Sequence, residues 1–569
     1  MAEFDLVIRG GLIVDGNGGP PVAGDVAITD SVIREVGTVS GTGSQEINAD
    51  GAVVSPGFVD VHTHYDAQVT WSNHLDPSSW HGVTTVVMGN CGVGFAPALP
   101  ANRDRLVELM EGVEDIPGVV MREGLPWTWT SFEDYLDVIA RREYDIDVAA
   151  QLPHAPLRVQ VMGERAAAHA DATADDIELM SKLAARAIEA GAIGFSTSRS
   201  INHKSVTGEL TPSYEASASE LVSIARAIGK TGKGVLQLVS DWPDVDADFR
   251  LMRAMVNASS RPLSMTFIDR VDQPERYLAV FDQLDKANAA GLPIRGQVPP
   301  RGIGLLLGLQ CTLNPFMTNA VYKSELQHLP VSERTSRMAQ PDMRTRVLAA
   351  QTDEIDPNVV GGALVNRWHQ MFELGNLPNY ELDPNLSIAK IAERQGRAPA
   401  EVAYDLLIAD EGKAMVYLTS STYAGGSLDT VYKLLTHPHT VPGLSDGGAH
   451  VATICDASFP TTLLQHWVRD RDGERLGLPF AIKRQARDTA WAVGLTDRGV
   501  LAPGFKADVN VIDLDGLRVH RPEMYYDLPS GGKRLMQRAD GYKHTVVSGV
   551  ETYRDGQPTG ALPGRLVRS

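Results

Sequence analysis

The sequence alternates short apolar runs with amphipathic helical stretches, and this alternation restricts the possible folds more than any other feature. Between the apolar runs, stretches such as 173–189 and 217–228 gather apolar residues on one face and open with Thr173 or Ser217, residue types that cap helices. The apolar runs predicted to be strands lie at 57–64, 83–89, 147–152, 192–197, 234–240, 262–268, 293–298 and 440–446. Eight strands alternating with helices predict an α/β fold of the (β/α)8 barrel type.

The two ends of the chain differ from this middle, because there short strands are separated by turn residues such as Gly10-Gly11. Since chain termini often lie close together, we expect both ends to form one small β-sandwich. Two long stretches between strands are expected to be insertions at the barrel mouth. In the first half of the second stretch, the apolar residues show no clear periodicity. The expected boundaries are 1–56 and 499–569 for the β-sandwich, 57–498 for the barrel, and 92–146 and 299–439 for the insertions.

Composition narrows the possible partners. The formal charge of −19 disfavours nucleic acids and acidic membranes, which favour basic surfaces, and leaves small molecules. Three cysteines among 569 residues are too few for a disulfide framework. The first residues include acids where a secretory signal carries bases, and no apolar run is long enough to span a membrane. We expect a cytoplasmic protein, and a homo-oligomer, as large acidic barrels commonly are.

The first strand candidate ends in two histidines, His62 and His64, separated by one residue. Side chains at positions i and i+2 of a strand point to the same face, so both imidazoles are expected to converge on one point. Two converging imidazoles are typical of a divalent-metal site.

Two further metal-binding residue types end neighbouring strands. Cys91 follows the second strand candidate and Asp446 ends the last one. Because the active sites of (β/α)8 barrels lie at the carboxyl ends of their strands, we expect Cys91 and Asp446 to join His62 and His64. Such a set suits zinc, which activates a bound water as a nucleophile, and Asp446 would take that water's proton and pass it to the leaving nitrogen. Cys91 can also be read as a buried inert thiol, and Asp446 as a helix cap.

Four motifs in this order resemble the amidohydrolase superfamily, in particular its N-acyl-D-amino-acid deacylase (D-aminoacylase) branch. They are Pro56-Gly-Phe-Val-Asp-Val-His-Thr-His64, Gly82-Val-Thr-Thr-Val-Val-Met-Gly-Asn-Cys-Gly92, Ser445-Asp-Gly447 and Asp497-Arg-Gly-Val-Leu-Ala-Pro-Gly-Phe-Lys-Ala-Asp508. The resemblance covers nearly the whole chain and implies a metal-dependent barrel with a β-sandwich formed by both termini.

The chain departs from the branch at the fifth and sixth strands, where the resemblance implies two metal-binding histidines. Neither 234–241 nor 262–269 contains a histidine, and no arginine follows Asp446 closely to hold a substrate carboxylate. We therefore expect one metal ion rather than two, zinc or another divalent ion. Substitute ligands could be Asp241, Asp269 or Gln297.

Three other polar residues are candidates for substrate binding. His154, after the third strand, could polarise the substrate carbonyl, Arg199 could bind an anionic group, and His450 follows Asp446 closely. A core or loop position without a role in binding is an equal alternative for His154. An exposed loop position without a role in binding is an equal alternative for Arg199. The tryptophans expected near the pocket are Trp71, Trp80, Trp127 and Trp129.

Taken together, these residues predict a metal-dependent hydrolase, and the resemblance implies that it cleaves a carbon–nitrogen amide bond in an N-acyl amino acid or another small-molecule amide. Hydrolysis of a cyclic amide or an ester needs similar chemistry and stays open. A non-catalytic barrel with a degenerate metal site is the alternative from another class. The survival of His62, His64 and Asp446 argues against it.

Overall fold

The computed structural model describes residues 2–270, 273–356, 359 and 361–569. At its centre lies a parallel sheet of eight strands, in the order β16-β12-β11-β10-β9-β8-β7-β6. In chain order these strands are β6 (Phe58–Asp60), β7 (Val83–Met88), β8 (Asp147–Pro153), β9 (Gly194–Arg199), β10 (Val235–Ser240), β11 (Leu263–Thr266), β12 (Ile294–Val298) and β16 (Thr440–Pro442). Each lies within or overlaps one of the eight predicted runs, and the (β/α)8 barrel is confirmed.

The barrel closes where the chain leaves its two edge strands, β6 and β16. Thr63 and Gly447 form a parallel bridge there. The amide of His64 donates to the carbonyl of Gly447 at 2.7 Å, and the amide of Asp446 donates to the carbonyl of His62 at 3.2 Å. Closure of the barrel therefore places the two histidines beside the aspartate, although nearly 400 residues separate them in sequence.

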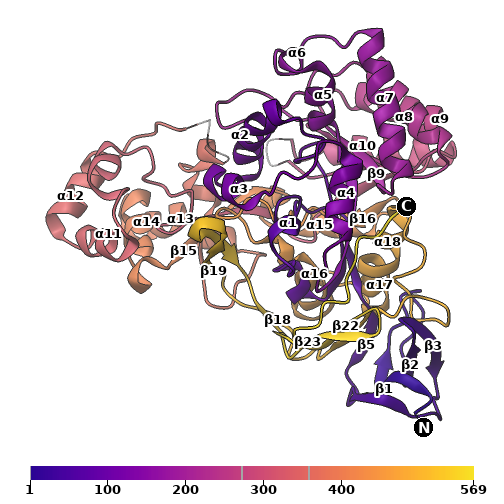
Figure 1. The fold of residues 1–569 in the computed structure, drawn as a ribbon. Coiled ribbons are helices and arrows are strands. Elements are labelled where there is room, and N and C mark those ends of the chain that lie inside the picture. Colours follow the sequence, from indigo (N-terminus) through magenta and orange to yellow (C-terminus); the bar gives the residue numbers. More distant parts are fainter. Residues whose placement is uncertain (1, 271–272, 357–358, 360) are drawn as a thin grey trace.

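Helices cover the outside of the barrel, and the two predicted helices are present. Thr173 and Asp176 form a capping box at the start of one, and Ser217 caps the other. The outer helices are α5 (His154–Met162), α6 (Glu164–Ala167), α7 (Ala174–Glu189), α8 (Ala218–Lys230), α9 (Val245–Ser259), α10 (Arg276–Ala289), α15 (Asp429–Thr436), α16 (Phe459–Leu464), α17 (Leu478–Lys483) and α18 (Thr489–Ala492). Helices α7, α8 and α9 stand side by side in Figure 1, and neighbouring members of this row pack on each other.

Two long connections carry elements of their own. The connection after β7 holds α2 (Arg103–Glu114), α3 (Gly118–Gly124) and α4 (Phe132–Ala140), and a short helix α1 (Gln68–Trp71) precedes β7. The connection after β12 forms the lobe that projects to one side in Figure 1. Its elements are β13 (Ile303–Gly308), α11 (Val331–Met338), α12 (Pro341–Ala349), β14 (Met371–Leu374), α13 (Ile388–Gln395), α14 (Pro399–Leu407) and β15 (Met415–Ser421). The antiparallel sheet β13-β15-β14 in this lobe was not predicted.

Strands from both ends of the chain share one nine-stranded sheet, as expected. Its strands are β1 (Phe4–Ile13), β2 (Val22–Thr29), β3 (Val32–Gly37), β4 (Gly43–Asn48), β5 (Val53–Pro56), β17 (Val509–Ile512), β22 (Tyr542–Val547), β23 (Val550–Arg554) and β24 (Gln557–Pro558). The sequence suggested a turn at Gly10-Gly11, which is wrong, because β1 continues through both glycines and its register against β2 shifts there as at a bulge. Short pairs β18 (Arg518–Val519) with β21 (Ala539–Asp540) and β19 (Glu523–Leu528) with β20 (Gly532–Met536) lie between these strands in sequence.

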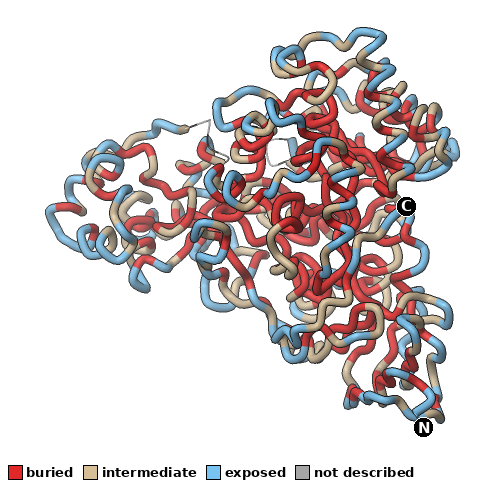
Figure 2. The backbone as a smooth tube through the Cα atoms, viewed as in Figure 1, coloured by how far each residue is buried: buried red, intermediate tan, exposed pale blue. Residues whose placement is uncertain are grey.

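Buried residues concentrate along the barrel strands and the helices around them (Figure 2). A second apolar cluster fills the lobe and includes Leu307, Phe316 and Tyr404. The lobe thus has an apolar core of its own. Among the described residues, none of the helices combines the length and the apolar character that crossing a lipid bilayer requires.

Candidate metal centre

Three buried side chains meet at the carboxyl end of the barrel. Nitrogen atoms of His62 and His64 and the sulfur of Cys91 lie within 4.8 Å of one another. His62 Nε2 is 3.2 Å from Cys91 Sγ. A carboxylate oxygen of Asp446 lies 3.4 Å from His62 Nε2 and 3.6 Å from His64 Nε2. The structure thus brings together the four side chains that the sequence predicted as ligands.

A hydrogen bond fixes the form of His62. Its Nδ1 donates to Gln297 Oε1 at 2.6 Å, since an amide oxygen can only accept. The proton therefore resides on Nδ1, and the Nε2 lone pair faces Cys91 and Asp446. Gln297 is itself oriented by donating through Nε2 to Ser264 Oγ at 2.9 Å. Gln297, which the sequence offered as a substitute ligand, instead supports a ligand from behind.

The local electrostatics suit a cation. Burial lowers the pKa of His62 to about 4, so its imidazole is neutral at pH 7. Burial opposes ionisation of Asp446, but the hydrogen bond from His64 and the positive charges of His64 and, at acidic pH, of His62 outweigh burial and hold its pKa well below the usual range. Burial also raises the pKa of Cys91 to about 12. A divalent cation would supply the positive charge that a thiolate needs, so this donor set fits a metal.

Four residues at or next to the site have strained backbone, as do several turns elsewhere in the chain. The φ angles of Cys91, Asp446 and His450 are 57°, 49° and 48°, and that of Leu444 is 64°. Side-chain-bearing residues seldom adopt this left-handed region, which occurs in turns and at functional sites. The strain agrees with a binding role for the loops after β7 and β16.

The three predicted substrate contacts have different surroundings. His154 is fully buried, and its ring accepts from Thr197 Oγ1 at 2.9 Å and donates to Glu220 at 2.8 Å, so neither nitrogen is free. Arg199 is half-buried and donates to the carbonyl of Ala216. The structure does not bring either residue into the metal cluster. His450 is connected to the cluster through Glu114, whose Oε2 lies 3.6 Å from His450 Nε2 and whose Oε1 lies 3.3 Å from His64 Nδ1.

Two residues of the site were missed. Glu114, at the end of α2, lies 3.3 Å from His64 Nδ1 and is 1 % exposed. His203, in the loop after β9, donates to or accepts from Ser198 Oγ at 2.7 Å. Burial and the nearby charge of His64 lower the pKa of His203 to about 3. The sequence feature that could have pointed to Glu114 is an acid beside the apolar residues of an amphipathic helix. For His203 it is a position in a polar run after a strand.

The other two predicted substitute ligands have different surroundings. Asp241 accepts hydrogen bonds from Ser200 Oγ and from the amide of Ile201, and so holds the loop after β9. Asp269 is buried, and neither of its oxygens has a hydrogen bond among the described residues.

Trp129 is buried and donates to the carbonyl of Phe95, while Trp80 stacks against Arg538.

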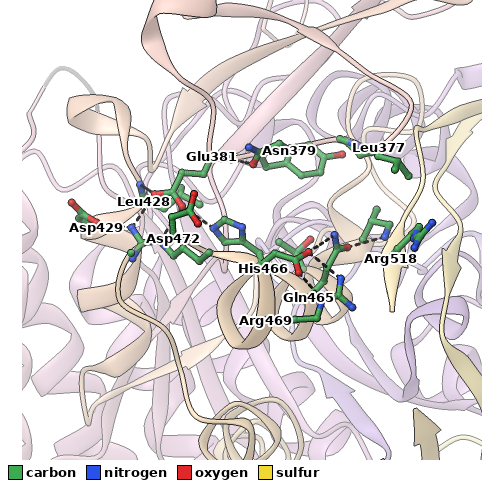
Figure 3. A pocket seen from close by; sticks show the side chains of 17 residues that line it. Leu377, Asn379, Glu381, Leu428, Asp429, Gln465, His466, Arg469, Asp472 and Arg518 are labelled. Atoms are coloured by element: carbon green, nitrogen blue, oxygen red, sulfur yellow. Dashed lines mark hydrogen bonds and ion pairs between the residues drawn. The ribbon is translucent and has the colours of Figure 1, made fainter. Parts of the chain in front are cut away.

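A cavity of about 690 Å³ lies apart from the metal cluster, between the lobe, the π-helical turn Gln465–Asp470 and β18 (Figure 3). Glu381 in its wall accepts from His466 Nε2 and Arg471 Nε, each at 2.9 Å. These charged groups satisfy one another. A cavity of about 30 Å³ instead adjoins Asp446, with room for one or two water molecules.

Comparison with known proteins agrees with this site. The model of the Amidohydrolase family matches residues 45–558. An uncharacterized protein of Mycobacterium tuberculosis is 29 % identical over 97 % of this chain and 92 % of its own length. The N-acyl-D-glutamate deacylase of Alcaligenes xylosoxydans xylosoxydans is 26 % identical over 100 % of this chain and 97 % of its own.

Two solved structures share the fold over the full length of both chains. The crystal structure of D-aminoacylase has a TM-score of 0.66 at 22 % identity. N-acyl-D-glutamate deacylase from Bordetella bronchiseptica, complexed with zinc and a phosphonate inhibitor, has a TM-score of 0.66 at 24 % identity. These two likenesses show the shared fold. The family match, together with the curated relative, shows that the chain belongs to the amidohydrolase family, in its D-aminoacylase-like branch, and is a hydrolase of carbon–nitrogen bonds other than peptide bonds.

Proposed function

We propose that the protein hydrolyses the amide bond of an N-acyl amino acid or a related small-molecule amide, with one divalent metal ion, zinc, held by His62, His64, Cys91 and Asp446. The observation that carries the proposal is the convergence of four donor side chains around the unprotonated Nε2 of His62. A bound zinc ion would supply Lewis acidity and an activated water.

The residues of the chain account for binding and proton transfer. Gln297 keeps the Nε2 lone pair of His62 directed at the cluster. Asp446 is the base, because its carboxylate is held ionised and 20 % of its side chain is exposed. It accepts the proton of the attacking water and returns it to the leaving nitrogen, which balances the reaction as amide plus water giving acid plus amine.

Two measurements test the proposal. Elemental analysis of the purified protein should find about one zinc per chain. A panel of N-acyl amino acids of both hands and of neutral amides, scored by release of the amine, should then show turnover that a chelator abolishes and zinc restores. Absence of metal, or turnover that survives complete removal of metal, would refute the proposal.

A further inference from the structure

Glu114 has no role in the proposed function so far, although it touches the metal cluster. It is the last residue of α2, in the connection after β7, and it is almost fully buried. A buried carboxylate needs partners that repay the loss of its hydration. Its surroundings should therefore show what it does.

The end of α2 is held firmly in place. A Cβ at Gly112 would lie 2.2 Å from the carbonyl carbon of Ser205, so the helix touches the loop after β9 at van der Waals distance. Asp115 accepts hydrogen bonds from the hydroxyls of Thr312 and Thr453. The amide of His450 donates to the carbonyl of Glu114. Glu114 is therefore fixed between loops that follow two barrel strands and the lobe.

The two carboxylate oxygens of Glu114 face two different imidazoles. Oε1 lies 3.3 Å from His64 Nδ1, and Oε2 lies 3.6 Å from His450 Nε2. Neither His64 Nδ1 nor Glu114 Oε2 has a hydrogen bond within the described part of the chain. His64 can bind a metal through Nε2 only when Nδ1 carries the proton. Glu114 is the acceptor placed to receive that proton's hydrogen bond.

We propose that Glu114 is a positioning residue which holds His64 in the metal-binding tautomer and, through its second oxygen, keeps His450 beside the site. A carboxylate behind a metal-binding histidine fixes the ring and raises its basicity. The inference rests on the proposed function, since it assigns a support to one of the proposed zinc ligands.

The test is the zinc dissociation constant, measured by competition with a chelator of known affinity. Glu114→Ala should weaken zinc binding by about tenfold to a hundredfold. Glu114→Gln keeps the shape and a neutral acceptor, so its loss should be smaller, about threefold to tenfold. Glu108→Gln, on the same helix and without a side-chain partner among the described residues, is the matched control and should bind zinc as the wild type does.

The outcomes separate the possible roles. A merely structural role would lower the melting temperature of Glu114→Ala and leave the zinc affinity of the folded variant unchanged, which would overturn the proposal. If Glu114→Ala does not fold, Glu114→Gln decides, and an unchanged dissociation constant overturns the proposal again. If the wild type itself binds no zinc, the proposed function fails before this inference is reached.

A second observation, independent of Glu114, concerns Gln237 on β10. This side chain is fully buried, and neither atom of its amide has a hydrogen bond among the described residues. Its register partners are Ser196 on β9 and Ser264 on β11. Burying two polar atoms without hydrogen bonds costs free energy. We therefore expect a bound group to form hydrogen bonds with both atoms of this amide.

The register places this amide inside the barrel at the level of the metal cluster. Ser196 Oγ accepts from the amide of Gly92, next to Cys91. Ser264 Oγ accepts from Gln297, which holds His62. Side chains at paired positions of neighbouring parallel strands point the same way. Gln237 therefore lies between these two serines, in the row that runs from Cys91 to His62.

We infer that Gln237 binds the substrate through a neutral group that both donates and accepts, such as a carboxamide. A carboxylate could accept from Nε2 but would leave Oε1 without a donor. This inference deepens the proposed function, because it favours amides with a second neutral polar group over N-acyl amino acids with a free carboxylate.

The experiment compares N-acetylated amino acids with their carboxamides on zinc-loaded protein. The wild type should have the higher kcat/KM for the carboxamides. Gln237→Leu should raise KM for the carboxamides by about tenfold or more, because a buried partner is left unpaired. Its kcat and zinc content should change little. Gln327→Leu, at an exposed position of the lobe, is the control.

Two results would overturn the inference. One is an unchanged KM for the carboxamides in Gln237→Leu, which would mean that the side-chain amide of Gln237 binds only water. The other is a wild-type preference for the free carboxylates. If no substrate of either kind is turned over while zinc binds, the proposed function fails instead.

Discussion

The two sides of the barrel differ in the chemistry at their strand ends. On one side the chain after β6, β7 and β16 supplies two imidazoles, a thiol and a carboxylate within contact distance. On the other side β10 and β11 supply Gln237 and Ser264. Neutral amides and hydroxyls are weak zinc ligands beside imidazole and thiolate.

This difference shows how one fold can place metal binding and substrate binding on different sides of the barrel. The side with strong donors is held by support from behind, through Gln297 and Glu114. Among the described residues, buried polar atoms without a hydrogen bond occur on both sides. On the first side His64 Nδ1 faces Glu114 at 3.3 Å, and on the second side such atoms belong to the amide of Gln237 and the hydroxyl of Thr266. We infer that the first side holds the one metal and that the second side is free to meet the substrate.

The strongest way to break this comparison is to remove a donor from the first side. In His64→Ala we expect zinc to fall to about 0.1 equivalent per chain or less and turnover to fall to background. The three remaining ligands lack the buried imidazole of His64 and so bind zinc much more weakly. Metal analysis with a turnover assay checks this. The exposed His328→Ala in the lobe is the control. Full zinc in His64→Ala would show that the second side can hold the metal.

Asp446→Asn tests whether the carboxylate acts as a base rather than only as a ligand. The amide can still coordinate through its oxygen, but it cannot take a proton. We expect zinc to be retained while kcat falls by about 10²-fold to 10⁴-fold. The pair of measurements, kcat and zinc content, decides. Turnover near the wild-type value would refute the assigned base.

The barrel was predictable because each strand is an apolar run bounded by turn residues and each helix has its own periodicity. The metal cluster was predictable for a related reason, since His62, His64, Cys91 and Asp446 lie at or just after the ends of those runs. Local pattern and the position of a strand end were sufficient in both cases.

Glu114 and Gln237 show where sequence reasoning stops. Glu114 reaches His64 only because α2 folds back over the barrel mouth, a tertiary arrangement that no local pattern specifies. Gln237 stands in the middle of a strand, and its unpaired amide becomes visible only once its neighbours are placed. The sheet of the lobe was missed because its strands are far apart in sequence, β13 and β15 pairing across more than 100 residues.

Cys91→Ser sharpens the comparison by weakening one donor without removing it. A hydroxyl is a poorer zinc ligand than a thiolate, so we expect the zinc dissociation constant to rise by about tenfold to a hundredfold, with a smaller loss of kcat at saturating zinc. Chelator competition measures the first effect. Cys311→Ser, at another buried cysteine, is the matched control. An unchanged constant in Cys91→Ser would return the cysteine to a packing role.

The smallest effect is expected on the second side, at Asp269 beyond the end of β11. Burial raises the pKa of this carboxyl group to about 6 in the folded protein, above its ordinary value of 3.8. Above pH 6 the folded state therefore holds an unfavourable buried charge, and this penalty disappears as the pH falls below about 4. Asp269→Asn should raise the free energy of unfolding by about 1 to 2 kcal/mol at pH 8 and by little at pH 4. Denaturant unfolding at both pH values, with the exposed Asp50→Asn as control, measures this difference. A gain of equal size at both pH values would show that Asp269 carries no buried charge, and a loss of zinc would move it into the metal site.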